Sequence, residues 1–203
     1  MVGRKIREVL ERVPSIFKSR DFISQDADNP NSKDTYDDMT NAKIKEESLS
    51  LTVSSIITNM LEYSDHANVQ KGGCAALSDL ARSEENKTII SHEGGIEVII
   101  NAMDNHILNV DVQEYSCKAL GSLTHHCDEN RVTVPSEGGI QVILRAMKLH
   151  STHTDIQEAA CRALYNLACD LGNSESIAAE GGINLIIECM NSCKLLQVTR
   201  RSL

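Results

Sequence analysis

Four short motifs recur along the chain at a common spacing. A Val-Gln or Ile-Gln pair begins at Val69, Val112 and Ile156, so that successive copies lie 43 and 44 residues apart. Ala-Leu pairs, single asparagines and Gly-Gly pairs repeat with the same period, and they begin at Ala76, Ala119 and Ala163; Asn86, Asn130 and Asn173; Gly94, Gly138 and Gly181. A period of about 40–47 residues is typical of helical solenoids, in which each unit buries its apolar face against neighbouring units. The sequence therefore predicts an all-α solenoid whose function lies on an extended surface.

Each complete repeat is predicted to contain three helices. The expected ranges are 85–93, 96–105 and 112–126 in one unit, and 129–137, 140–149 and 156–170 in the next. The Gly-Gly pair between the first two helices supplies the left-handed backbone conformation that other residues resist, so the chain can turn sharply there. Partial units flank these repeats: 54–62 and 68–82 match a second and a third helix, and 174–180 and 183–192 match a first and a second helix.

The third helices carry a start signal and an apolar stripe. Asp111 and Asp155 precede them, with Glu114 and Glu158 three residues later, which is the spacing of an aspartate form of the capping box. From Ile156 onward, small and apolar residues recur at helical spacing, which predicts one buried face. This stripe continues through Ala160, Ala163, Leu164 and Leu167.

Charge and cysteine content restrict the function and the location. A formal net charge of −9 argues against general binding of nucleic-acid backbones, which requires a basic surface. No apolar run approaches the roughly 20 residues that cross a bilayer, so no membrane span is expected. Seven cysteines without a secretory signal favour a reducing compartment, and we expect the cytoplasm or the nucleus. Cys74, Cys117 and Cys161 share one repeat position, where they are predicted to be small packing residues.

The segments outside the repeats differ from them in composition. Residues 1–20 are basic and predict a short amphipathic helix that Pro14 interrupts; a mitochondrial transit peptide is the alternative, although Glu8 and Glu11 count against it. Residues 21–47 are acidic with few large apolar groups, which favours a disordered acidic linker. The solenoid is expected over 51–193 and a C-terminal tail over 194–203.

Two features of the repeats resemble a known family. A Glu-Gly-Gly-Ile turn recurs at 93–96, 137–140 and 180–183, and the third-helix core is clearest in IQEAACRALYNLACD at 156–170. Both are similar to armadillo repeats, whereas HEAT repeats have two helices per unit and lack this turn. The resemblance implies a right-handed superhelix whose third helices line a concave groove, and it implies that this groove binds extended peptides or protein partners.

Helix geometry identifies candidate residues of this groove. Positions six and ten residues after the first residue of each stripe lie near −120° and −80°, beside each other and off the buried face. Together with residues one turn further on, they give a candidate binding site of Asp79, Arg82, Lys118, Ser122, His125, Arg162 and Asn166. Nuclear-import adaptors of the family have a Trp and an Asn at such positions, and only Asn166 matches here. Lys118 and Arg162 favour an acidic or polar extended segment, unless both are merely solvated surface residues.

The sequence lacks the usual motifs of an enzyme or a metal site. It contains no nucleophile elbow, phosphate loop or paired-acid motif, so we expect neither catalysis nor a cofactor. The histidines at 125, 126, 150 and 153 lack zinc-ligand spacing and are predicted to be exposed loop residues. The sequence thus predicts an interaction scaffold or adaptor. The alternative is a structural assembly module that associates with itself through the open C-terminal end of the solenoid.

Overall fold

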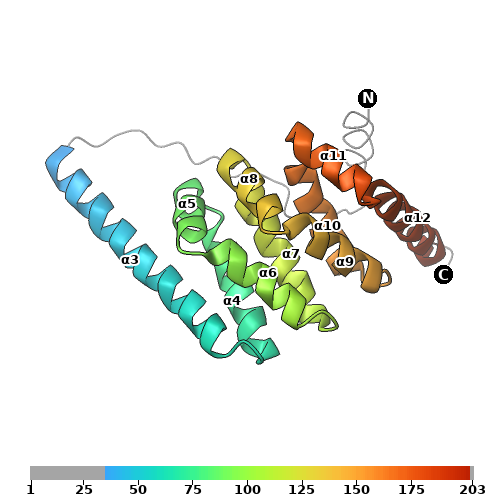
Figure 1. Cartoon of the computed structure of the whole chain (residues 1–203), viewed down its shortest axis with the longest axis horizontal. Helices are drawn as coiled ribbons and strands as arrows, with labels where there is room; N and C mark the ends of the chain where they lie inside the picture. The colour runs from blue at the N-terminus through green and yellow to red at the C-terminus, as the bar shows by residue number, and fades with distance from the viewer. Residues whose placement is uncertain (1–34, 202–203) are drawn as a thin grey trace.

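The structure is a computed structural model that describes residues 35–201, with side chains described over 45–192. This part of the chain contains ten helices and no strand (Figure 1). The helices are α3 (Thr35–Glu62), α4 (Ala67–Leu80), α5 (Glu84–His92), α6 (Gly95–Asn105), α7 (Val110–Thr124), α8 (Asp128–Ser136), α9 (Gly139–Leu149), α10 (Thr154–Leu167), α11 (Leu171–Ala179) and α12 (Gly182–Arg201). The predicted all-helical repeat architecture is confirmed.

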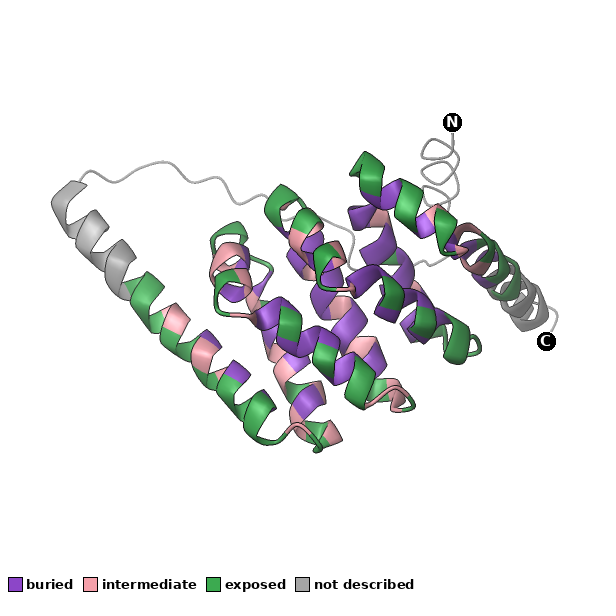
Figure 2. Ribbon diagram, in the orientation of Figure 1, coloured by how far each residue is buried: buried purple, intermediate pink, exposed green. Residues whose placement is uncertain are grey.

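The helices stack in the order that the repeats predict. The first helices are α5, α8 and α11, the second helices are α3, α6, α9 and α12, and the third helices are α4, α7 and α10. Helix α7 packs between α4 and α10, and the middle of the array is its most buried part (Figure 2). Leu77, Leu120 and Leu164, at equivalent positions of the three third helices, are fully buried. The equivalent cysteines, Cys74, Cys117 and Cys161, are buried as predicted.

The Gly-Gly pairs make the turn between the first and second helices. Gly94, Gly138 and Gly181 have φ values of 87°, 86° and 83°, which confirms the predicted left-handed conformation. The second glycine of each pair is needed for a different reason. At Gly139 a Cβ atom would lie 2.7 Å from the carbonyl oxygen of Val134 in the preceding helix. The second helix can therefore pack closely against the end of the first only without a side chain here.

The Val-Gln and Ile-Gln motifs tie the second helix of each unit to the third. Each glutamine is buried, and its Nε2 atom donates to two main-chain carbonyls at the end of the second helix. The first of these bonds measures 2.8 Å in all three units, from Gln70 to Met60, Gln113 to Met103 and Gln157 to Met147. The second carbonyl belongs to Tyr63, His106 and His150 respectively. Helix ends leave such carbonyls without partners inside the helix. The glutamine supplies the donor for the methionine carbonyl, whereas the second carbonyl also accepts a backbone N–H from the residue three positions later.

The repeated asparagines serve the opposite end of the third helices. The Nδ2 atoms of Asn86, Asn130 and Asn173 donate to the carbonyls of Leu80, Leu123 and Leu167, at 2.7, 2.9 and 3.2 Å. Asn173 also donates to the carbonyl of Arg131 in the preceding unit, at 2.7 Å. Two of the four sequence motifs are therefore helix-capping devices.

The third helices begin earlier than the sequence predicts. Asn109 is the N-cap of α7, and its side chain accepts a hydrogen bond of 3.0 Å from the backbone N–H of Val112. His153 precedes α10 without a side-chain cap. Asp111 and Asp155 therefore lie inside the first turns, where a negative charge still interacts favourably with the helix dipole, and the predicted capping boxes are wrong.

The ends of the array also differ from expectation. Helix α3 begins at Thr35, so residues 35–47 are helical and not part of a disordered linker. The stretch NAKIKEESL at 41–49 is rich in good helix formers, a propensity that the low apolar content of the segment concealed. Helix α12 continues to Arg201 and takes in most of the predicted tail. The predicted amphipathic helix at 1–20 and the remaining linker, 21–34, lie outside the described residues.

Candidate functional site

The predicted site residues lie on the third helices or at their ends. We call the exposed and half-buried side chains of α4, α7 and α10, with the residues that follow each helix, the third-helix face. Side chains join the three helices along it. The hydroxyls of Ser78 on α4 and Ser122 on α7 are 3.1 Å apart, and the Nδ2 atom of Asn166 on α10 donates to the carbonyl of Gly121 on α7 at 2.8 Å. The candidate residues therefore belong to one continuous surface over three repeats.

Six of the seven predicted residues are accessible on this face. Asp79, Arg82, His125 and Arg162 are exposed, and Lys118 and Ser122 are half-buried. Asn166 differs, because it is only 4% exposed. Helices α7 and α10 approach closely at Gly121, where a Cβ atom would lie 3.6 Å from the backbone nitrogen of Ala163. The amide of Asn166 is consequently covered and holds the two helices together.

Each predicted cation of the face is paired with a nearby carboxylate. Lys118 contacts Glu114 at 2.5 Å, and Arg162 contacts Glu158 at 3.6 Å, both one turn apart on the same helix. Arg82 pairs with Asp79 at 3.2 Å. Pairs between exposed side chains contribute little to stability, typically less than about 1 kcal/mol. A partner's charged groups could therefore replace either member at small cost.

Tyr115 and Lys71 belong to the same face and were not predicted. Tyr115 is half-buried on α7, with the Nζ atoms of Lys71 and Lys118 lying 5.6 and 5.0 Å from its ring centroid. Lys71 also bridges α4 to α7 through a 2.7 Å ion pair with Asp111, which raises the pKa of Lys71. Tyr115 is three residues after Val112, near −60° on the helix, beside the candidate positions six and ten residues after Val112. The spacing could have revealed it.

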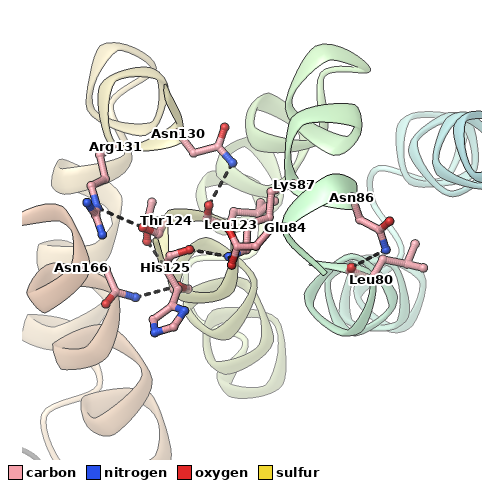
Figure 3. A network of polar contacts seen from close by, with 11 residues as sticks. Leu80, Glu84, Asn86, Lys87, Leu123, Thr124, His125, Asn130, Arg131 and Asn166 are labelled. Carbon is pink, nitrogen blue, oxygen red and sulfur yellow. Dashed lines mark hydrogen bonds and ion pairs between the residues drawn. The ribbon is translucent and has the colours of Figure 1, made fainter. Parts of the chain in front are cut away.

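The C-terminal end of α7 receives polar side chains from α5, α8 and α10 (Figure 3). The carbonyl of Leu123 accepts from Asn130, and that of Thr124 accepts from Nε of Arg131 at 3.2 Å. The carbonyl of His125 accepts from the Nζ atom of Lys87, a lysine on α5 in the same repeat that is only 1% exposed. Lys87 also pairs with Glu84 at 2.6 Å. Two cations thus face the negative end of the α7 dipole.

The histidines divide into two kinds. His125, His126 and His153 are exposed, as predicted, and the first two rings lie edge to face with centroids 4.1 Å apart. Burial, the neighbouring His126 and the charge of Lys87 lower the pKa of His125. His150 contradicts the prediction, because it is only 6% exposed. Its Nε2 atom lies 2.8 Å from the carbonyl of Ile107 in the preceding repeat, so burial is compensated by a hydrogen bond.

The described residues contain neither a metal-binding cluster nor a membrane-spanning helix. Among them, no group of three or more His, Cys, Asp or Glu side chains is arranged to hold a metal ion. None of the described helices has the length and apolar character needed to cross a membrane.

Comparison with known proteins identifies the repeats. A family model described as LRRK2 ARM repeat matches residues 32–198. Protein aardvark of Dictyostelium discoideum is 41% identical over 80 residues, which is 37% of this chain and 10% of aardvark, so the chain spans about a tenth of the length of this curated relative. No solved structure matches significantly. ARM repeats are generally protein-interaction modules and typically non-catalytic. The match over most of its length shows that the chain belongs to the LRRK2-type ARM repeat family.

Proposed function

We propose that the third-helix face binds an extended segment of a protein partner whose side chains are acidic or polar. The observation that carries this proposal is a band of cations around Tyr115 whose ion pairs are weak enough for a partner's charged groups to replace. Lys71 and Lys118 lie on this band, and Arg162 continues it onto α10. An extended segment suits a surface that crosses three parallel helices, because it can contact one repeat after another.

The ion pairs of the face explain why the partner is expected to carry charge. Lys118 and Arg162 are 37% and 43% exposed at their side chains, so both remain accessible although each has a carboxylate neighbour. An acidic side chain of the partner would compete for these cations, and a polar one would use their remaining hydrogen-bond donors. Electrostatic complementarity of this kind contributes mainly to specificity and to the rate of association.

The test compares two double variants with the same change in charge. Lys118→Glu with Arg162→Glu reverses the cations of the face, and Arg145→Glu with Lys148→Glu reverses two exposed cations on α9, outside it. Partners recovered on the wild-type chain are identified by mass spectrometry, and their affinities for each variant are then measured at several salt concentrations. We expect the face variant to lose affinity and most of its salt dependence, while the α9 variant keeps both. Unchanged binding by the face variant would place the interface elsewhere.

The alternative function is assembly of the chain with copies of itself. It is favoured by Ile187 on α12, which is 40% exposed and lies one turn from the half-buried Ile183. An exposed apolar side chain beside another on one helix face is the kind of surface through which proteins associate.

A further inference from the structure

The corner between α7 and α8 is one residue longer than the corners of the neighbouring repeats. The capping asparagine follows the buried leucine of the third helix by nine residues at Leu77 and Asn86 and at Leu164 and Asn173, but by ten residues at Leu120 and Asn130. Helix α7 accordingly has 15 residues, whereas α4 and α10 have 14. The middle repeat therefore contains an insertion at the end of its third helix.

The extra residue changes the backbone of the corner. Ala81 and Ala168, which follow α4 and α10, have near-helical conformations with ψ values of 3° and −2°. His125, which follows α7, has ψ of 118°, and His126 has φ of 50°. His126 is the one non-glycine residue with positive φ within the described part of the chain. Such a conformation carries a steric cost for residues with a side chain, so something must hold it.

Lys87 holds this corner from α5, the first helix of the same repeat. Its ammonium donates to the carbonyl of His125, and in Figure 3 that carbonyl points toward Lys87 while the imidazole of His125 points to the other side. The lysine is almost wholly buried, and Glu84 balances its charge. Arg131 occupies the equivalent position of the next repeat, but it donates to Thr124, a carbonyl that the insertion does not displace. Lys87 thus binds the carbonyl that the longer corner adds.

We propose that the α7–α8 corner is a specificity-determining site at the end of the third-helix face, and that Lys87 is its positioning residue. The insertion places two exposed imidazoles side by side, where the shorter corners place Arg82 and Ser83 or Cys169 and Asp170. Each imidazole carries a ring N–H that can donate a hydrogen bond, so the pair suits an oxygen acceptor, a carbonyl or a carboxylate, of the extended partner segment. This inference rests on the proposed function for the identity of the partner, but the role of Lys87 does not.

The role of Lys87 is tested on the free chain by a double-mutant cycle. Lys87→Met is combined with deletion of His126, which shortens the corner to the length of its neighbours, and unfolding by urea is measured for all four chains. In the natural corner, Lys87→Met should raise the equilibrium constant for unfolding about tenfold, because a hydrogen bond to a charged group is lost. In the shortened corner the buried lysine lacks its carbonyl acceptor and keeps only the carboxylate of Glu84, so Lys87→Met should leave the constant unchanged or lower it. The matched control, Arg131→Met, should cost the same in both corners. An equal effect of Lys87→Met in both corners would overturn the positioning role.

Recognition by the corner is tested with the partner recovered on the wild-type chain. His125→Ala with His126→Asn removes both imidazoles and keeps the length of the corner, and Asn tolerates the left-handed conformation. Affinity should fall at least tenfold, while Arg131→Met leaves it unchanged. Unchanged affinity of the histidine variant would overturn the inference. If Lys118→Glu with Arg162→Glu still lost binding in that case, the proposed function would stand without the corner as a recognition site.

Discussion

Gln141 on α9 donates a hydrogen bond of 2.6 Å from Nε2 to Oε1 of Glu180, in the turn of the next repeat. The equivalent junction at the start of the array is similar, because the carboxylate of Glu93 accepts from Ser50 and Ser54 at 2.6 Å each, which lowers the pKa of Glu93. At the middle junction Glu97 takes the position of Gln141, and Glu137 takes the position of Glu180. Burial, and secondly the charge of Glu97, raise the pKa of Glu137.

Replacing Glu97 with Gln should stabilise the chain at neutral pH. The amide removes a like charge and supplies the donor that Gln141 supplies one repeat later, so the free energy of unfolding should rise by about 0.5 kcal/mol. A raised pKa means that the folded chain binds this proton more tightly than the unfolded chain, so the wild type loses stability as the pH rises through the pKa of Glu137. Urea unfolding over a pH series should show the gain shrinking at lower pH. Glu85→Gln on α5 is the control, and an equal gain there would point to a reduction of net charge alone.

Replacing a buried glutamine with methionine should weaken the fold. Gln113→Met keeps the length of the side chain but removes the donor of the Met103 carbonyl and one of the two donors of the His106 carbonyl, at a cost of about 2 kcal/mol. Gln141→Met, on the exposed surface of α9, should cost less than about 0.5 kcal/mol. Urea unfolding of both variants provides the measurement. Similar values for the two would show that the buried carbonyls find water or other donors.

The two glycines of one turn should respond to alanine for different reasons. At Gly138, with φ of 86°, alanine should cost about 1 kcal/mol of backbone strain, although there is space for the methyl group. At Gly139 a methyl group would lie 2.7 Å from the carbonyl oxygen of Val134, so α8 and α9 must separate, and the cost should be about 2–3 kcal/mol. Thermal unfolding of the two variants gives the order. A larger effect at Gly138 would contradict the packing explanation.

Self-association through α12 should depend on Ile187. If this surface joins two copies, light scattering of the wild-type chain should show a mass that rises with concentration, and Ile187→Glu should restore the monomer. Asn184→Glu adds the same charge to an exposed position of α12 and serves as the control. A wild-type chain that remains monomeric at high micromolar concentration would exclude this assembly.

The order of the helices could be predicted from the sequence because the repeats fix it, but the partners of individual side chains could not. Periodicity shows that Gln70, Gln113 and Gln157 are equivalent without showing that they bind the preceding helix. For the same reason Asn166 was placed on the surface, since the close approach of α10 to Gly121 is a tertiary contact. Helical angles correctly gave the accessible positions of Lys118 and Arg162.

The insertion beside His126 shows the limit of the repeat argument most clearly. The spacing of 44 between Asn86 and Asn130, against 43 between Leu77 and Leu120, was present in the sequence. Its consequence depends on Lys87, which lies 38 residues before His125 on another helix and reaches the corner through a buried contact. A local pattern cannot reveal such a partner.

The like charges of Glu97 and Glu137 also determine how the array deforms under load. The turn at Glu137 lacks the hydrogen bond that its neighbours have, but Arg145 on α9 pairs with Asp104 on α6, and Asn166 fastens α10 to α7. A bending force should therefore separate this turn from α6 first, while the contacts of Arg145 and Asn166 hold both layers of helices. The weak point of the junction is thus a single turn, so bending there should leave the spacing along the third-helix face unchanged.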